Sequence, residues 1–508
     1  MIRGGPRVAN SAATVVGGLA IVTAATGVIA AYVWTPAFVL LGLLLVSLIG
    51  FSASRWPRTA IVLVVLSPIL DRYLIVGVLP EELSLVTHVF SEALLVVVGL
   101  VVAYGAWRDG RLVPALRHPV SAALLAFGLV AIVSSVVNGV PLQVAATGVA
   151  FTVDATACFF LPRMVGFSTR QSLIGLGAVG GLILVAALVA VAQALLSPNI
   201  LGLSALHGRF GEVYRLASFL GDPNVFGAFL LVATPFALFA VTRLSRPRDR
   251  RIALAITFIL VLALWLSFSR GAWIGLLVGT GLVALLLDRR ALLIGAVVTA
   301  VAFGTALTMP RDLLIAHQPG DGSSSEQPER PNLIDSTVGR FGTVGSGRDL
   351  RTLFIRNALP IIGDHPIVGV GPGRYGGAAA DIFGTPVYEA YGTDALFSNP
   401  TQATVDNFWL HLLVEFGIAG MVSLLAAAVI PGIAVLRAAW QVRRGAAAVM
   451  LAGIAAATAG VAVNSVSTML LEANSIAFTF WFLLGIGSLL ASAARTEPED
   501  EVPRTDAR

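Results

Sequence analysis

Long apolar runs divide this chain from end to end, and they constrain its fold more than any other feature. A helix needs about 20 mostly apolar residues to cross about 30 Å of hydrocarbon. About fourteen runs approach or exceed that length: 11–33, 36–53, 59–79, 88–107, 119–138, 142–161, 171–196, 223–242, 252–268, 271–287, 291–309, 407–436, 446–468 and 474–494. We therefore expect an all-α, polytopic membrane protein with about 14 transmembrane helices. A membrane β-barrel is excluded, because its strands would be about ten residues long and alternate in polarity.

The composition excludes other classes of protein. Of the 508 residues, 57% are hydrophobic and 12% are charged, whereas soluble chains carry about 25% charged residues. A soluble enzyme and a disordered chain are thereby excluded. The net charge of +5 comes from Arg residues between apolar runs, which indicates membrane orientation and not nucleic-acid binding. The one cysteine, Cys158, lies in an apolar run, and no cluster has metal-ligand spacing, so we expect neither metal nor cofactor.

The distribution of Arg predicts the orientation in the membrane. If the N-terminus is cytoplasmic and the runs alternate, 22 of the 33 Arg residues lie in inner connections and tails, and four lie in short outer connections. Positive charge favours the cytoplasmic side of short loops. We therefore expect a multi-pass protein of the cytoplasmic (inner) membrane with both termini cytoplasmic.

The chain is expected to fall into four parts. Residues 1–196 form the N-terminal transmembrane helices, 197–435 the core, 436–494 the C-terminal transmembrane helices, and 495–508 a disordered cytoplasmic tail. The core includes a long extracytoplasmic loop, 310–405. Loops of this length are usually functional or disordered. Its first part, rich in Gly, Pro and Ser, is typical of a linker, whereas the apolar spacing from Arg348 to Leu359 predicts an amphipathic surface helix.

Several Arg residues lie on the outer side, where Arg is otherwise rare. They are Arg215, Arg270 and the pair Arg348 and Arg351. The planar guanidinium donates two parallel hydrogen bonds to phosphate oxygens and stays charged. Together they predict a site for a lipid-linked diphosphate; the alternative for each alone is an interfacial Arg whose charge reaches the lipid headgroups.

Polar residues also open the late apolar run. Asp406 and Asn407 precede it, and Asn407, His411 and Glu415 are spaced i, i+4, i+8. Such a stripe in a membrane helix faces the bundle or a watery cavity. A carboxylate there can remove a proton from a sugar hydroxyl, so Asp406 is the candidate general base and His411 a second proton-handling group. The alternatives are a helix N-cap for Asp406 and Asn407 and a packing role for His411.

A glycine run precedes this helix. His365 is followed by Gly369, Gly371 and Gly373, whose backbone N–H groups can contact an anion. The run follows no βαβ pattern, so a dinucleotide fold is not implied.

In order, these motifs resemble a known family. They are Arg215 before Asp222-Pro223-Asn224; Ser269-Arg270-Gly271-Ala272-Trp273; Gly347-Arg348; His365-Pro366-Ile367-Val368-Gly369-Val370-Gly371-Pro372-Gly373; and Asp406-Asn407-Phe408-Trp409-Leu410 with Glu415-Phe416-Gly417. Over roughly 200–435 the chain resembles the O-antigen ligase/polymerase family, the Wzy/WaaL-like integral membrane glycosyltransferases.

The resemblance implies a GT-C-like fold and a reaction. A glycan would pass from a polyprenyl (undecaprenyl) diphosphate carrier to a sugar hydroxyl of a glycan or glycolipid acceptor on the outer face of the membrane, without metal or nucleotide. Arg270 and Arg348 would hold the diphosphate with Arg215, and Arg351 would replace Arg348 if needed. Asn407, His365, His411, Gly369, Gly371 and Gly373 would line the substrate site. The ligases carry His where this chain has Asp406, which favours a polymerase or another transfer.

Two other functions are compatible with the hydropathy. A transporter or flippase of amphiphilic substrates would use Asp154 and Glu415 as intramembrane ion groups. It would not need the long Arg-bearing loop, and the sequence indicates no paired halves with broken helices. The third possibility is a non-catalytic scaffold in envelope assembly.

Overall fold

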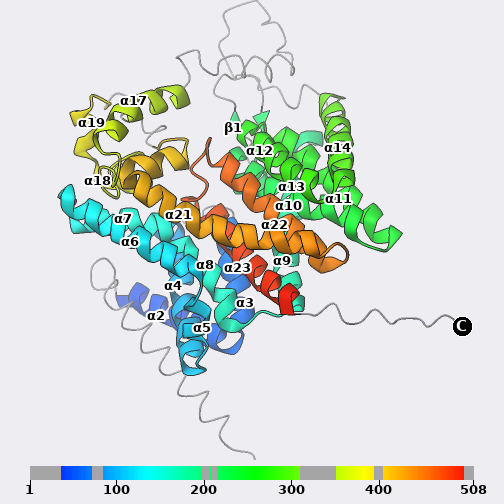
Figure 1. Cartoon of the computed structure of the whole chain (residues 1–508), viewed down its shortest axis with the longest axis horizontal. Helices are drawn as coiled ribbons and strands as arrows, with labels where there is room; N and C mark the ends of the chain where they lie inside the picture. The colour runs from blue at the N-terminus through cyan, green and yellow to red at the C-terminus, as the bar shows by residue number, and fades with distance from the viewer. Residues whose placement is uncertain are drawn as a thin grey trace, which may run out of the picture.

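The described part of the chain is built almost entirely of helices (Figure 1). The computed structural model describes residues 36–70, 84–196, 206–207, 214–308, 350–393, 397 and 404–496. The longer helices are α2 (Pro36–Arg55), α3 (Pro57–Leu70), α4 (Ser84–Arg108), α6 (Pro119–Val137), α7 (Leu142–Val153), α8 (Ala157–Val165), α9 (Thr169–Leu195), α10 (Pro223–Arg243), α11 (Pro247–Leu266), α14 (Arg289–Thr308), α17 (Leu350–Asp364), α21 (Phe408–Gln441), α22 (Ala446–Asn464) and α23 (Asn474–Thr496). The predicted all-α class is confirmed.

Shorter elements complete the described chain. The helical ones are α5 (Leu112–Leu116), η3 (Asp154–Thr156), η5 (Ser218–Leu220), α12 (Arg270–Gly275), η6 (Leu276–Thr280), α13 (Gly281–Leu287), α18 (Ala378–Phe383) and α19 (Pro386–Ala390). Within the described ranges, strands are limited to β1 (Leu206–His207) and β2 (Tyr214–Arg215), which pair antiparallel.

Ten helices in the described part are long and apolar enough to span a membrane. They are Phe90–Arg108, Pro119–Val137, Leu142–Val165, Thr169–Leu195, Pro223–Arg243, Arg270–Leu287, Arg289–Leu307, Phe408–Gln441, Ala446–Asn464 and Asn474–Ala494. Each coincides with a predicted run. The predicted spans 36–53, 59–79 and 252–268 overlap α2, α3 and α11, which are helical but not among the ten, and 11–33 lies outside the described residues. The predicted total of fourteen is therefore not confirmed.

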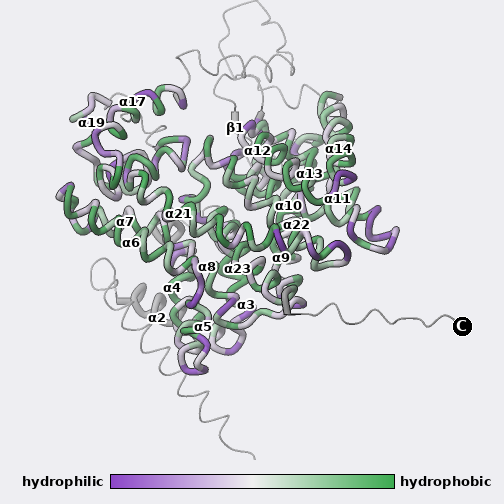
Figure 2. The backbone as a smooth tube through the Cα atoms, viewed as in Figure 1, coloured by the Kyte–Doolittle hydropathy of each residue, from purple (hydrophilic) through white to green (hydrophobic). Residues whose placement is uncertain are grey.

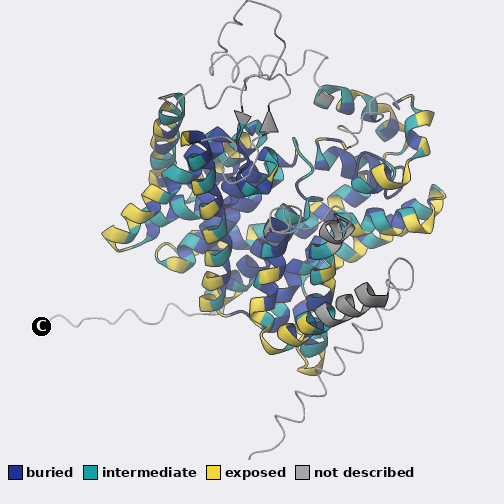
Figure 3. Ribbon diagram, turned by 180° about the vertical axis from the view of Figure 1, so that it is seen from behind, coloured by how far each residue is buried: buried dark blue, intermediate teal, exposed yellow. Residues whose placement is uncertain are grey.

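The spans differ in how much protein covers them. Two-thirds or more of the α10, α22 and α23 spans is buried, and the core includes Phe226 and Phe229 of α10 and Phe478 and Phe482 of α23. These helices lie centrally and are dark blue in Figure 3. Polar residues gather toward helix ends and over α17 and α19 (Figure 2). On α6, Leu125, Leu129 and Val136 remain exposed, as expected for side chains that face lipid.

One span is broken, contrary to the absence of broken helices indicated by the sequence. Within α21, Gly417 has φ 63° and ψ −170°, so the helical hydrogen bonds are interrupted there. A Cβ atom on Gly417 would lie 2.3 Å from the carbonyl oxygen of Ile367. Only glycine satisfies both the backbone conformation and this close approach. One long apolar run in the sequence thus conceals two helical segments.

The segment that contains the glycine run supplies hydrogen-bond partners for the backbone groups around this break. The N–H groups of Ile418 and Ala419, which have left the helical ladder, donate to the carbonyl groups of Pro366 (2.9 Å) and Ile367 (3.1 Å). In return, the N–H groups of Val370 and Gly371 donate to the carbonyl oxygens of Val414 and Glu415, both at 3.0 Å. Broken backbone within a membrane protein is stable only where the freed groups find such partners. The two sequence motifs are therefore one structural unit.

The second half of the long loop folds against the start of α21. One face of α17 buries Phe354, Ala358 and Ile361 together with Tyr375 and Val414. The amphipathic helix predicted from the apolar spacing is confirmed, and in Figure 1 it lies with α18 and α19 above the beginning of α21.

Candidate functional site

A cavity of about 430 Å³ lies where four distant segments meet. They are the start of α12, the first turns of α17, residues 404–407 and the turn after α22. Its lining comprises Arg270, Gly271, Ile274, Arg351, Thr352, Phe354, Ile355, Val405, Asp406, Asn407, Val466 and Ser467. Four of the residues singled out in the sequence, Arg270, Arg351, Asp406 and Asn407, thus converge on one cavity.

Arg351 and Asp406 form an ion pair across this cavity. Nη2 of Arg351 lies 3.5 Å from Oδ2 of Asp406, and their side chains are 35% and 54% exposed. Such a partly exposed, long pair is weak, typically about 0–1 kcal/mol. The Nε atom of Arg351 is buried and has no hydrogen-bond partner among the described residues. This guanidinium therefore has both a replaceable partner and an unsatisfied donor.

Asn407 sets the position of Asp406. The side chain of Asn407 accepts a hydrogen bond from the N–H of Leu410 at 3.0 Å and caps α21. The capping role considered for this dipeptide therefore falls on Asn407. The cap leaves the preceding Asp406 carboxylate at the cavity.

Close packing of α12 against the end of α22 fixes the position of Arg270. A Cβ on the next residue, Gly271, would lie 2.1 Å from Oγ of Ser467 and 2.4 Å from Oδ1 of Asn464. The start of α12 therefore lies directly on the end of α22. Nδ2 of Asn464 is also buried without a partner in the described structure. Asn464 and Ser467 are not singled out by the sequence, because both lie within the predicted apolar run 446–468.

Arg215 lies beside the turn that leads to Arg270. Its Nη2 donates to Oδ1 of Asn224 at 2.7 Å and its Nε to the carbonyl of Ser267 at 3.3 Å. Oγ of Ser269 donates to the same Asn224 oxygen at 3.4 Å. Arg215 thus supports the turn and is not part of the cavity lining described above. Arg348 lies outside the described residues, so its phosphate contact stays a prediction.

His411 and Glu415 lie in a separate buried cluster. Both residues are at most 2% exposed, so the polar stripe faces the protein interior as predicted. Nδ1 of His411 donates to the carbonyl of Tyr375 at 2.6 Å, and its Nε2 lies 3.8 Å from carboxylate oxygens of both Glu415 and Glu472. Glu472, which itself accepts a hydrogen bond from the N–H of Ala378 at 3.0 Å, was not anticipated from the sequence.

The glycine run surrounds a carboxylate of the chain itself. The N–H groups of Gly373 and Tyr375 donate to the two oxygens of Glu415 at 2.8 and 2.7 Å. Gly369, Gly371 and Gly373 have φ of 70°, 109° and 73°, and a Cβ on Gly369 would lie 2.4 Å from the backbone of Glu415. Their observed contacts are therefore structural, and the half-buried His365 precedes them. A direct role of these four residues with substrate stays a prediction.

Two tyrosines close the other side of this cluster. The hydroxyl of Tyr375 donates to the carbonyl of Phe354 at 3.4 Å, and that of Tyr388 accepts a hydrogen bond from the N–H of Gly376 at 2.8 Å. Burial raises the pKa of both hydroxyls, so both remain protonated at physiological pH. They connect α17 and α19 to the glycine run. No group of three or more His, Cys, Asp or Glu in the described residues is arranged to hold a metal ion.

Comparison with known proteins identifies the region that contains this cavity. A family model described as O-Antigen ligase matches residues 255–425, from α11 to the second half of α21. A search of curated proteins found no match. The matched residues include Arg270, Arg351, Asp406 and the glycine run, whereas Arg215 precedes them. The resemblance is thereby confirmed over this region: residues 255–425 match the O-antigen ligase family model.

Proposed function

We propose that this protein transfers a glycan from a polyprenyl diphosphate carrier to a sugar hydroxyl, within the cavity that holds Arg270, Arg351 and Asp406. The observation that carries this proposal is the convergence of two cations and one carboxylate from three distant segments. The family of residues 255–425 supports the general reaction class. The identity of the carrier and the role of each residue are the specific part of the proposal.

The cavity suits an amphiphilic donor. Ile274, Ile355 and Val466 line it with apolar side chains that are about half exposed. Arg270 and Arg351 supply positive charge in the same lining. A lipid diphosphate combines an apolar chain with a doubly charged head, so both parts find matching surface. Arginine binds diphosphate oxygens with charge-assisted hydrogen bonds.

Binding of the donor would also free the Asp406 carboxylate to act as the general base. When a diphosphate contacts Arg351, it competes with the Asp406 carboxylate for the same guanidinium. Asp406 is then released to accept the proton of the acceptor hydroxyl. The acceptor oxygen forms a bond to the anomeric carbon as the bond from that carbon to the diphosphate oxygen breaks. The electron pair leaves with the diphosphate, and Arg270 and Arg351 stabilise the charge that develops.

Asp406 also bears on the type of transfer. By resemblance, ligases carry His at this position, so a carboxylate favours a polymerase. The excess of Arg in the connections assigned to the cytoplasm supports an extracytoplasmic position for the cavity.

The transporter alternative has less support. The Glu415 carboxylate accepts two backbone N–H bonds at 2.8 and 2.7 Å, as expected of a structural group. Oδ1 of Asp154 accepts from the N–H of the next residue, Ala155, at 2.5 Å. Neither contact requires a bound ion.

Glycan transfer by purified full-length protein tests the proposal. The assay would use lipid-diphosphate-linked glycan with wild type, Asp406→Ala, Arg270→Ala and, as a control, Arg356→Gln. Arg356 is exposed on α17 but does not line the cavity. We expect Asp406→Ala and Arg270→Ala each to lower the rate at least about 100-fold and Arg356→Gln to leave it unchanged. Full activity of both cavity variants would contradict the proposed mechanism.

A further inference from the structure

A second cavity, of about 740 Å³, lies at the other end of the same helices. Its lining comprises Val241, Thr242, Arg243, Leu244, Ser245, Arg250, Leu287, Asp288, Arg289, Arg290, Ile294, Arg443 and Arg444. Six of these residues are Arg and one is Asp. The Arg residues lie in or next to three separate connections: that between α10 and α11, that between α13 and α14, and that between α21 and α22.

Two membrane spans separate this cavity from the candidate glycan-transfer cavity. The helix Arg270–Leu287 begins at one cavity and ends at the other. The α10 span runs in the same direction, from Pro223 beside the Arg215 turn to Arg243. At about 1.5 Å per residue these helices extend roughly 27–32 Å, the thickness of the hydrocarbon layer. The two cavities therefore lie at opposite membrane faces, and the distribution of Arg assigns the second to the cytoplasmic face.

Arg243 is fixed inside this second site. It is 5% exposed, and its Nη1 donates to the carbonyl groups of Ala439, Val442 and Ala448, each at 3.3 Å. Its Nε is buried and has no hydrogen-bond partner among the described residues. The backbone carbonyl of Arg243 accepts from the N–H of Gly445 at 3.1 Å, which joins the end of α10 to the turn before α22. A buried, anchored guanidinium with an unsatisfied donor needs an acceptor.

The lining contains too little negative charge to neutralise its arginines. Its single acid, Asp288, accepts hydrogen bonds from the N–H groups of Arg290 (3.1 Å) and Ala291 (3.4 Å) and so caps α14. The general preference for Arg on the cytoplasmic side accounts for the presence of these residues. It does not account for their gathering from three connections around one cavity. Arg246 and Arg248 show the contrast, since they lie in one of these connections, are exposed and do not line it.

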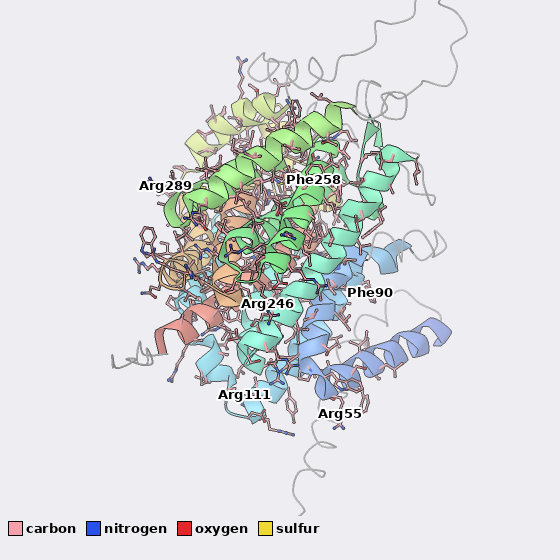
Figure 4. All side chains as sticks on the ribbon, turned by 90° about the vertical axis from the view of Figure 1, so that its right-hand side faces the viewer. Arg55, Phe90, Arg111, Arg246, Phe258 and Arg289 are labelled. Carbon is pink, nitrogen blue, oxygen red and sulfur yellow. The ribbon has the colours of Figure 1, made fainter. Side chains whose placement is uncertain are left out.

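Figure 4 labels Arg289, which lines this cavity, and Arg246, which does not. Arg289 lies at the beginning of α14, and Arg246 lies at the beginning of α11. Leu287 and Ile294 line the cavity beside the charged groups, so it combines basic and apolar surface.

We propose that this second cavity binds a phosphate oxyanion at the headgroup level of the inner leaflet. Basic pockets between membrane helices bind phosphate-bearing lipid headgroups in this way. The same chemistry can come from an anionic phospholipid or from free phosphate. This inference is independent of the glycan-transfer reaction and of the residues proposed for it.

Lipid binding by the full-length protein tests the inference. Detergent-purified protein would be titrated with phosphatidylglycerol or phosphatidylcholine, and bound lipid counted by native mass spectrometry. The variants are Arg289→Gln/Arg290→Gln and Arg443→Gln/Arg444→Gln. The matched control is Arg246→Gln/Arg248→Gln, which removes the same charge from the same face but leaves the cavity intact. All six positions are exposed, so folding is expected to survive, and thermal unfolding without lipid verifies this.

We expect wild type to bind phosphatidylglycerol in preference to phosphatidylcholine. Each cavity pair should weaken this binding at least about tenfold, and the control pair should leave it unchanged. Displacement of the lipid by millimolar inorganic phosphate would identify phosphate itself as sufficient. Retention of the lipid would identify the phospholipid as the ligand. An equal loss in the control pair, or undiminished binding in both cavity pairs, would overturn the inference.

Discussion

Nη2 of Arg351 lies 3.5 Å from Oδ2 of Asp406 and joins the first turn of α17 to the residue before the cap of α21. Neither group is fully buried, so the pair can open without the large penalty of leaving a buried charge unpaired. Since Arg270 lines the same cavity, an incoming diphosphate would meet two guanidinium groups, and the carboxylate would be released. The proposed catalytic cycle depends on this exchange.

Replacing Asp406 with Asn should separate binding from catalysis. The amide keeps the shape of the side chain but cannot accept a proton as a base, so we expect kcat to fall at least about 100-fold. It also competes less strongly for Arg351, so the donor KM should fall or stay constant. Steady-state kinetics with varied lipid-linked donor give both numbers. An unchanged kcat would show that Asp406 is not the base.

Replacing Arg351 with Lys should weaken donor binding although the charge is kept. An ammonium group cannot donate the two parallel hydrogen bonds of a guanidinium. We expect the donor KM to rise roughly 10- to 100-fold, as for the loss of one charge-assisted hydrogen bond. Arg356→Lys on the same helix is the control and should behave like wild type. Equal kinetics for both Lys variants would place the phosphate contact elsewhere.

Replacing Gly417 with Ala should destabilise the fold. Alanine at φ 63° is strained, and its Cβ would collide with the backbone of Ile367. We expect a loss of at least about 2 kcal/mol in the free energy of unfolding, measured as a lower Tm in detergent. The control is Gly432→Ala in the same helix, where a Cβ would have no heavy atom within 4 Å. That variant should keep or raise the Tm.

Replacing Glu415 with Gln should loosen the glycine run. A glutamine presents only one acceptor oxygen, so the N–H of either Gly373 or Tyr375 would lose its bond. An unsatisfied buried donor costs about 1–3 kcal/mol. We expect a lower Tm and faster amide hydrogen exchange over residues 369–377, whereas Glu389→Gln on the surface of α19 should change neither. A Tm equal to that of wild type would show that the carboxylate is not a structural partner.

The sequence was most informative where single residues interrupt a uniform pattern. Arg270 is conspicuous because Arg is rare on the outer side, and Asp406 because it opens an apolar run; the cavity brings both together with Arg351. The helical class and ten of the spans also follow from apolar length alone. The sequence pattern is sufficient in these cases because each membrane span requires a continuous run of apolar residues.

Non-local backbone contacts do not follow from the sequence pattern. The break at Gly417 lies inside an unbroken apolar run, and its partners at Pro366 and Ile367 come from a distant loop. For the same reason the glycine pattern predicts contact with an anion but does not identify that anion as the Glu415 carboxylate of the chain itself. The contacts of Arg215 with Asn224 and the carbonyl of Ser267 also do not follow from the sequence, and its role with the diphosphate stays a prediction. None of these partners is set by spacing along the chain.

Binding of a lipid diphosphate to the purified full-length protein tests the central claim most directly. Its affinity would be measured for wild type, for Arg270→Gln/Arg351→Gln and for the control Arg356→Gln. We predict at least about 100-fold weaker binding in the double variant and wild-type binding in the control. Wild-type affinity in a correctly folded double variant would contradict the account, because the diphosphate would then bind outside this cavity.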